Sequence, residues 1–210
     1  ALIGSKEHAS RQVQVGVDIL VAAGTEAGAH CGEVSTMVLI PEVCKAVQDS
    51  GVPVLAAGGI VTSRQMTACM AMGAHGAWTG SMWLTTAEAE TSPVVKDKYV
   101  QASSSETVRS RSRTGKHSRQ LRSPWTDAWE AEDAPDPLPM PLQSLVSEPA
   151  LARVTKLAES GHEGAKQLAT YWVGQGVGLM NSVQSTRDVV REFMEDYVAA
   201  AERLAATLED

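Results

Sequence analysis

A single histidine in a glycine-rich segment is the residue of this chain best placed to do chemistry. The segment at residues 24–32 reads GTEAGAHCG, and it directly follows an apolar run at residues 17–23 that predicts a buried strand. Glycines let the backbone approach a ligand closely, and the end of a strand fixes where the next side chains point. Because imidazole titrates near neutral pH, His30 is predicted to act as a catalytic base or acid. A structural or solvated histidine is the alternative.

Two neighbours of His30 offer further chemical options. The carboxylate of Glu26 could orient His30 or accept a hydrogen bond from a cofactor, and a solvated carboxylate fits the sequence equally well. Cys31 is adjacent to His30, but adjacent side chains in an extended segment point apart. The sequence therefore favours His30 alone over a Cys-His nucleophile.

Two more turns rich in small residues follow predicted strands. Gly58-Gly59 comes after the apolar run at residues 52–57, and Gly80-Ser81 comes after the short run at residues 76–80. Backbone N–H groups with no Cβ in the way, at the start of a helix, form a cradle for phosphate. In parallel eight-stranded barrels the last two strands commonly bind a cofactor phosphate in this way. Tight turns without a ligand are the alternative.

Two further segments have open interpretations. Basic residues gather between residues 109 and 122, where they could bind an anion or form a solvated loop: Arg109, Arg111, Arg113, Lys116, Arg119 and Arg122. The sequence GQGVG at residues 174–178 lies between helical segments. It is either a helix break that reaches the site or only a turn.

The elements that must position these residues alternate between apolar strands and short helices. Strands are predicted at residues 16–23, 52–57 and 76–80, and helices at residues 6–15, 41–50, 64–72 and 93–102. Ser5 and Ser63 are predicted to cap two of the helices. Strands that are apolar on both faces indicate a parallel sheet covered by helices, as in a barrel or a doubly wound sheet.

The remainder of the chain divides by composition. Residues 103–123 are rich in Ser, Thr and Arg, and residues 124–149 contain most of the prolines, so residues 103–149 are predicted as loop. Residues 150–210 return to helix. The last helix has an apolar stripe formed by Val189, Val190, Phe193, Met194, Tyr197, Val198, Ala201 and Leu204. Packing on the core is the preferred interpretation, and a dimer interface is the alternative.

The composition excludes several classes of protein. The 210 residues are 43% hydrophobic and 20% charged with a net charge of -7, which argues for a folded core and against a nucleic-acid partner. No apolar run approaches the roughly 18–20 residues that span a bilayer, and no secretory signal is visible. The three cysteines and five histidines have no metal-ligand spacing. We therefore expect a cytoplasmic protein with no metal and no membrane partner.

Taken together, the motifs resemble the nitronate monooxygenase family, formerly called 2-nitropropane dioxygenases. The matching segments, in order, are GTEAGAH at residues 24–30, PVLAAGGI at 53–60, WTGS at 78–81, TGK at 114–116, WTD at 125–127, PMPLQ at 139–143 and GQ at 174–175. The resemblance implies a TIM barrel that binds FMN without covalent attachment. It also implies oxidation of alkyl nitronates with O₂, with His30 as the catalytic base or hydrogen-bond partner near the flavin.

The resemblance also assigns the residues that contact FMN, chiefly at its phosphate and ribityl chain. They are Gly28, Gly58, Gly59, Trp78, Thr79, Gly80 and Ser81, together with the position of Ala23. Ala23 stands where the family usually has Gln, so a side-chain contact to the flavin is lost or replaced there. Ala29 stands where the family usually has Gly, which adds a methyl group beside the site. Ser81 replaces the usual Thr and keeps the hydroxyl.

Family members carry the first half of the barrel before the segment that matches Ala1. Residues 1–102 are therefore expected to form the second half of a (β/α)₈ barrel, and residues 150–210 are expected to pack on it as helices. Such a half exposes edge strands and an apolar interior. We expect it to need the N-terminal half of the barrel or another copy of the chain.

Two other functions compete with the oxidation of a nitronate, which would be the small-molecule substrate. FMN-dependent enoyl-thioester reductases, which use NAD(P)H, contain a similar His-containing segment, and the basic loop near Arg119 would suit a CoA or carrier-protein thioester. A truncated member could also be an inactive binding or assembly partner.

Overall fold

The computed structural model describes residues 1–208 and shows an α/β fold built on a parallel sheet. The sheet has four strands in the order β1-β2-β4-β5. Their bounds are Leu2–Ile3 for β1, Leu20–Ala23 for β2, Val54–Ala57 for β4 and Gly76–Ala77 for β5. Leu20 pairs with Val54 and Ala23 with Ala57, so β2 and β4 end at the same level. Parallel pairing brings the loops after these strands to one edge of the sheet.

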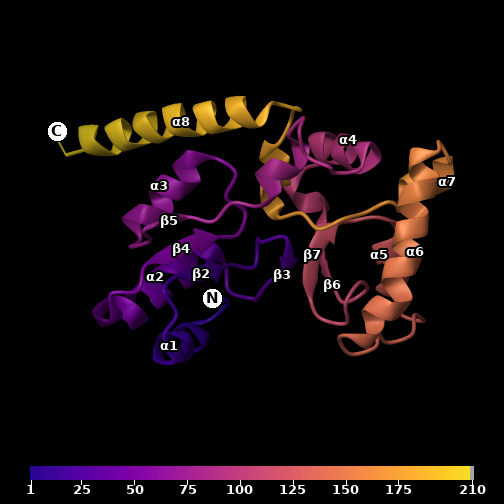
Figure 1. The fold of residues 1–210 in the computed structure, drawn as a ribbon, viewed down its shortest axis with the longest axis horizontal. Coiled ribbons are helices and arrows are strands. Elements are labelled where there is room, and N and C mark those ends of the chain that lie inside the picture. Colours follow the sequence, from indigo (N-terminus) through magenta and orange to yellow (C-terminus); the bar gives the residue numbers. More distant parts are fainter. Residues whose placement is uncertain (209–210) are drawn as a thin grey trace.

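Helices connect the strands and cover the sheet (Figure 1): α1 (Lys6–Val15), α2 (Thr36–Val47), the short η1 (Gln48–Ser50) and α3 (Ser63–Ala71). Ser5 caps α1 as predicted, because its side chain accepts a hydrogen bond from the amide of His8. The predicted start of α2 at Pro41 is wrong, since the helix begins at Thr36 and contains Pro41 in its interior. The predicted cap of α3 is one residue late, because Thr62 forms the capping box with Gln65.

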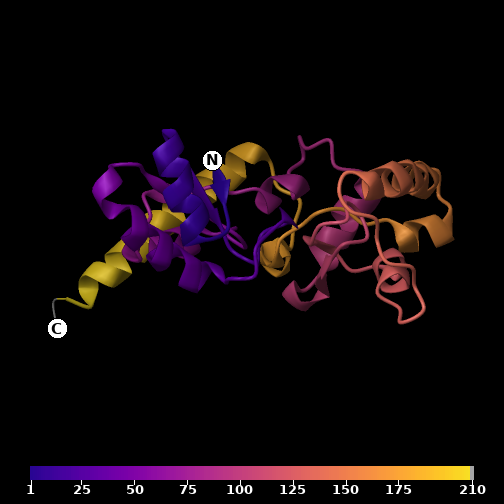
Figure 2. The same ribbon diagram turned by 90° about the horizontal axis from the view of Figure 1, so that it is seen from below.

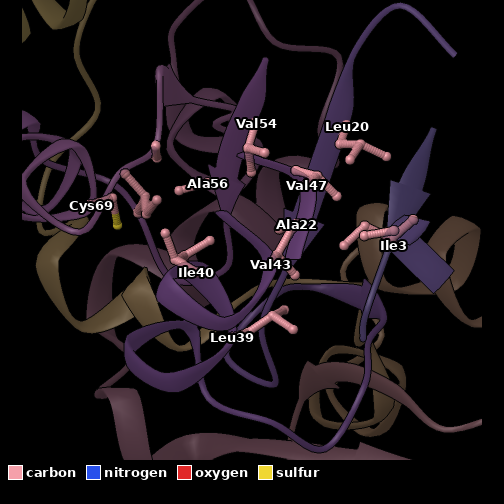
Figure 3. Close-up of a cluster of buried hydrophobic side chains, with 13 residues drawn as sticks. Ile3, Leu20, Ala22, Leu39, Ile40, Val43, Val47, Val54, Ala56 and Cys69 are labelled. Atoms are coloured by element: carbon pink, nitrogen blue, oxygen red, sulfur yellow. The ribbon is translucent and has the colours of Figure 1, made fainter. Parts of the chain in front are cut away.

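The core of this part of the chain lies between the sheet and α2 (Figure 3). Leu20 and Ala22 of β2, Val54 and Ala56 of β4, and Leu39, Ile40 and Val43 of α2 are all less than 2% exposed. Burying each large aliphatic side chain contributes about 1.5–3 kcal/mol. This packing fixes the level at which both strands end, and therefore the geometry of the loops that follow them.

A second lobe contains a three-stranded antiparallel sheet in the order β3-β7-β6 (Figure 1). The strands are β3 (Ala29–His30), β6 (Thr107–Ser110) and β7 (Ser118–Leu121). The helical elements that follow the parallel sheet in this lobe are α4 (Pro93–Gln101), η3 (Ser104–Glu106), α5 (Pro124–Trp129), α6 (Leu142–Glu159) and α7 (Glu163–Leu168). In Figure 2 the orange helices lie at one end of an elongated molecule and the indigo segments toward the other.

The prediction that residues 103–149 form only loop is therefore wrong. These residues contain β6, β7 and α5, and α6 begins within them at Leu142. The hairpin of β6 and β7 has no apolar sequence pattern, because its buried side chains are polar. Ser118, Arg119 and Gln120 are at most 7% exposed. Such residues are buried only where hydrogen-bond partners are supplied by the rest of the fold.

The C-terminal helices do not all pack where they were expected. The helix α8 (Thr186–Ala206) lies along α3 on the parallel-sheet lobe. In the second lobe α6 and α7 pack against each other, α6 also contacts α4, and α7 also contacts α5. On α8, Val189 and Phe193 pack beside Val61, Met82 and Met180. The rest of the predicted stripe is less covered, since Val190, Met194 and Val198 are 47–57% exposed. The stripe therefore packs on the core along one side only.

Each helix within residues 1–208 is too short or too polar to span a lipid bilayer. The same residues contain no group of three or more His, Cys, Asp or Glu side chains that could hold a metal ion.

Candidate active site

A cavity of about 310 Å³ lies at the carboxyl ends of β2 and β4 and brings together most of the predicted site. Its lining includes His30 and seven of the eight residues predicted to contact a cofactor: Ala23, Gly28, Gly58, Gly59, Trp78, Gly80 and Ser81. Ala23 and Ala57 are the last residues of their strands, so the cavity lies directly beyond the sheet edge. Segments far apart in the sequence thus converge on one concave surface.

The eighth predicted residue, Thr79, lies on the other side of its segment. Its hydroxyl and carbonyl oxygens accept hydrogen bonds from Nε1 of Trp83 at 3.1 and 3.2 Å. Thr79 lines a separate small cavity together with Val190 and Met194 of α8. Thr79 therefore faces α8 and does not line the cavity that contains His30.

His30 is presented by the short strand β3, where it pairs with Ser118 of β7. Its Nε2 lies 2.8 Å from the hydroxyl oxygen of Thr114. The ring of Trp172 lies 6.3 Å from the imidazole, centroid to centroid. Partial burial and, to a smaller extent, the charge of Lys116 lower the pKa of His30 below its usual value. His30 is therefore held in place and favoured in its neutral form, which is the form that can accept a proton.

Ala29, directly before His30, has φ = +61° and is the only non-glycine residue with positive φ among residues 1–208. A left-handed backbone costs a non-glycine residue about 1–2 kcal/mol. The methyl group that distinguishes this segment from Gly-Gly-His is thus carried on a strained backbone.

The turn at Gly58-Gly59 is the clearest candidate for binding an anion. Both residues have positive φ, at +110° and +69°. Within residues 1–208, no group accepts a hydrogen bond from the amides of Gly58, Gly59 or Ile60. Consecutive unpaired amides in such a turn form a concave nest that attracts negative charge.

Among the first three amides of the helix that follows this turn, that of Ser63 has no acceptor within residues 1–208, and Ser63 does not line the cavity. The amides of Val61 and Thr62 donate to the side-chain oxygen of Gln65, and the amide of Arg64 donates to Asp196 of α8. The free amides that line the cavity therefore precede α3.

The second turn adds donors on the neighbouring strand. Gly80 precedes the short helix η2 (Ser81–Thr85) and Ser81 begins it, and the amides of both residues have no acceptor within residues 1–208. The hydroxyl of Ser81 accepts a hydrogen bond from the amide of Gly174 at 2.8 Å. The hydroxyl of Ser81 thus holds a third segment, at Gly174, in place, which an apolar side chain could not do.

That third segment is the start of η4 (Gln175–Leu179), and it reaches the site. The amide of Gln175 donates to the carbonyl of Glu26 at 2.9 Å. A Cβ at Gly174 would lie 2.7 Å from the same carbonyl, so the chain passes too closely for a side chain. Of the two interpretations left open by the sequence, the structure supports a helix break that reaches the site.

Glu26 does not orient His30. Its carboxylate accepts hydrogen bonds from the amide and hydroxyl of Thr36, at 2.9 and 2.8 Å, and so caps the start of α2. This contact also explains why α2 begins before Pro41. Burial raises the pKa of the Cys31 thiol, which does not favour a nucleophilic thiolate.

Two of the basic residues between 109 and 122, Arg113 and Arg119, are buried, so neither belongs to a solvated loop or to an open anion site. Arg113 donates to both carboxylate oxygens of Glu148, at 2.7 and 3.0 Å. Arg119 donates to the carbonyl of Thr25 and the hydroxyl of Thr107, both at 2.9 Å. Both guanidinium groups thus join segments of the fold.

Two aromatic residues of the cavity were missed by the sequence analysis. Tyr171 and Trp172 line it, and the guanidinium carbon of Arg113 lies 4.7 and 4.5 Å from their ring centroids. Adjacent aromatic residues just before the GQGVG segment were a usable signal once that segment was known to reach the site.

The parallel sheet and the cavity beyond its carboxyl edge define an α/β protein with a nest of free amides beside a histidine. The model of the nitronate monooxygenase family matches residues 1–196, and the chain belongs to this family.

Known proteins are similar to this chain over nearly its whole length. Rv1533 of Mycobacterium tuberculosis, which is named as a monooxygenase, is 57% identical over 199 residues, covering 94% of this chain and 52% of its own. Nitronate monooxygenase npaC of Metarhizium robertsii is 34% identical over 188 residues, covering 83% of this chain and 50% of its own. The structure of FabK from Thermotoga maritima matches with a TM-score of 0.79 at 30% identity, covering 98% of this chain and 62% of that one. The chain thus spans about half the length of the curated relatives it matches.

Proposed function

We propose that this chain carries the flavin and substrate site of an FMN-dependent oxidoreductase that oxidises alkyl nitronates with O₂. The observation that carries the proposal is the convergence of His30 and two sets of unpaired amides on one cavity. Family membership supports the same activity.

The residues of the cavity fit FMN in chemistry. The amides of Gly58, Gly59 and Ile60, with those of Gly80 and Ser81, would hold the phosphate and the adjoining ribityl chain. Trp78 and the small residues Ala23 and Gly28 would line the apolar surface beside the ring system. When bound, FMN would supply the electron-accepting chemistry of the oxidation.

His30 would act on the neutral nitroalkane from which an alkyl nitronate forms, because this form carries an acidic C–H next to the electron-withdrawing nitro group. The lowered pKa keeps its imidazole neutral near pH 7, so it can accept that proton. Tyr171 and Trp172 would limit access of water to the same surface. The sequence departures at Ala23 and Ala29 lie beside this surface and bear on substrate choice.

We also propose that residues 1–102 are the second half of a TIM barrel. The support is the open four-stranded sheet, in which β1 and β5 are the outer strands. An N-terminal half of the barrel or another copy would pair with these strands. The activity is proposed to be cytoplasmic.

An enoyl-thioester reductase that uses NAD(P)H is the competing function within flavin chemistry. The basic loop supports it less, because Arg119 is 7% exposed and two of its N–H groups donate to Thr25 and Thr107. Mixing the FMN-loaded protein with propionate 3-nitronate or with NADH, without O₂, separates the two. Flavin bleaching by the nitronate alone supports the proposal, and bleaching by NADH alone contradicts it.

The cofactor is tested by adding FMN to the purified chain, removing free FMN and recording the visible spectrum beside the intact mass. A retained two-band flavin spectrum supports the proposal. A colourless protein that takes up no FMN would favour an inactive binding or assembly partner.

The role of His30 is tested by the variant His30→Asn. General-base catalysis is typically worth about 10²–10⁴-fold, so flavin reduction by nitroethane, which still carries its acidic C–H, is expected to slow by that factor. Unchanged reduction kinetics would rule out the base role.

A further inference from the structure

We propose that Thr114 fixes the tautomer of His30, with the proton on Nε2, so that Nδ1 is the atom that takes a proton from the substrate. The proposal rests on the proposed base role of His30. The position of the imidazole proton, however, can be measured without any activity.

The hydroxyl of Thr114 makes three polar contacts. The Oγ1 of Thr114 lies 2.8 Å from Nε2 of His30, 3.2 Å from the carbonyl oxygen of Lys116 and 3.3 Å from the amide nitrogen of Lys116. A threonine hydroxyl has one hydrogen to donate and two lone pairs to accept.

Only one assignment satisfies all three contacts. The carbonyl of Lys116 can only accept, so the hydroxyl hydrogen points to it. The amide of Lys116 can only donate, so it uses one lone pair of the hydroxyl. The remaining lone pair accepts a hydrogen bond from His30, which requires that Nε2 carries the proton. The reverse tautomer would leave two oxygen atoms 3.2 Å apart with no hydrogen between them.

The other ring nitrogen is then the basic one. Within residues 1–208, no group forms a hydrogen bond with Nδ1 of His30. His30 lines the cavity and remains solvent-accessible, so its unprotonated nitrogen is available to a ligand there.

The turn that carries Thr114 is rigid enough to impose this choice. Thr114 is 5% exposed. On one side, Arg113 is anchored to Glu148 of α6 by two hydrogen bonds, and the hydroxyl of Ser147 donates to the carbonyl of Arg113. On the other side, Gly115 has φ = +82°, and a Cβ there would lie 2.8 Å from the amide nitrogen of Met140.

The proton transfer balances as follows. The C–H bond of the substrate breaks, its electron pair stays on carbon and spreads into the electron-withdrawing group, and the proton binds Nδ1. His30 becomes an imidazolium whose Nε2–H still donates to Thr114. That hydrogen bond strengthens because its donor is now charged, so Thr114 stabilises the product of the transfer.

The first test is nitrogen-15 NMR of the histidine side chains in the full chain, at a pH where His30 is neutral. The wild-type protein is expected to show a protonated Nε2 and an unprotonated Nδ1. In Thr114→Val, which keeps the shape but not the hydroxyl, the two tautomers are expected to interchange. A wild-type His30 protonated on Nδ1 would overturn the proposal, even if no variant folds.

The second test is the rate of flavin reduction by nitroethane without O₂. Thr114→Val is expected to be about 10- to 100-fold slower, the range for losing a hydrogen bond to a charged group. Thr114→Ser should restore the rate to within about threefold, because a hydroxyl is again present. The control is Thr155→Val on α6, whose hydroxyl donates to Leu151 within its own helix; it should leave the rate unchanged.

The two tests separate failure of this inference from failure of the proposed function. Equal rates for wild type and Thr114→Val would overturn the role of Thr114. An Nε2–H tautomer in a protein that nitroethane does not reduce would support the tautomer assignment and overturn the base role of His30.

Discussion

His30 experiences two effects that lower its pKa, partial burial first and the positive charge of Lys116 second. Both disfavour the imidazolium in the folded chain, whereas the unfolded chain takes up a proton near pH 6.5. Stability contributed by the neutral His30 is therefore present above about pH 6.5 and is lost as the pH falls below that value. The acidic limb of flavin reduction is expected below the ordinary histidine pKa for the same reason.

Replacing Lys116 tests this effect. Lys116→Met removes the nearby positive charge, so the pKa of His30 is expected to rise toward its ordinary value. An NMR titration of the His30 ring protons measures it. The control is Lys45→Met, an equal change of charge at an exposed position of α2. An unchanged pKa in Lys116→Met would contradict the effect of its charge.

The strained backbone at Ala29 gives a prediction for stability. Ala29→Gly is expected to raise the free energy of unfolding by up to about 1 kcal/mol, because glycine tolerates φ = +61°. Ala27→Gly, at a neighbour without positive φ, should instead lower it by roughly 0.5–1 kcal/mol. Urea unfolding measures both, and an equal loss in the two variants would show that Ala29 carries no strain.

At the scale of elements, α8 is joined to the start of α3 by one carboxylate. Asp196 accepts hydrogen bonds from the hydroxyl of Ser63 at 3.1 Å and from the amide of Arg64 at 3.2 Å, and it also pairs with the Arg64 side chain. A carboxylate at a helix N-terminus satisfies free amides and interacts favourably with the helix dipole. Asp196 therefore helps to hold the apolar side of α8 against α3.

Asp196→Ala is expected to lower the free energy of unfolding by about 0.5–2 kcal/mol, the usual cost of losing a capping group. Glu195→Ala is the matched control, because Glu195 makes only a 3.9 Å contact with Arg191 on the same helix. Urea unfolding distinguishes them. If both variants lose the same small amount, the carboxylate of Asp196 does not stabilise the junction of α3 and α8.

At the scale of the whole molecule, the site depends on a close passage of three segments. Gly174 lies against the His30 segment and the Ser81 turn, and a Cβ there would lie 2.7 Å from the carbonyl of Glu26 and 3.3 Å from the hydroxyl of Ser81. Overpacking of this kind typically costs about 1–3 kcal/mol and displaces the backbone.

Gly174→Ala is therefore expected to weaken FMN binding by about tenfold or more, since about 1.4 kcal/mol corresponds to a factor of ten. Fluorescence titration with FMN measures the affinity. Gly164→Ala in α7, where the nearest atoms belong to His162, should bind FMN as the wild type does. Equal affinities for both variants would show that the passage of Gly174 does not shape the site.

Local sequence patterns were enough to predict those parts of the site that depend on neighbouring residues. His30, Gly58-Gly59 and Gly80-Ser81 follow apolar runs, and parallel pairing of those runs must bring their ends to one edge. The cavity at that edge contains these residues, and the family to which the chain belongs is the one its motifs resemble. The spacing of residues along the chain was enough for this prediction, because the apolar periodicity of strands and helices indicates where each element ends.

The contacts between segments that are distant in sequence become visible in the folded chain and could not be predicted from the sequence. Thr114 lies 84 residues from His30 in sequence, and Ser81 lies 93 residues from Gly174. The sequence placed Thr114 within a predicted loop, because the polar strand β7 has no apolar period. The burial of β7 depends on hydrogen-bond partners that only folding brings together, and no spacing rule along the chain specifies such partners.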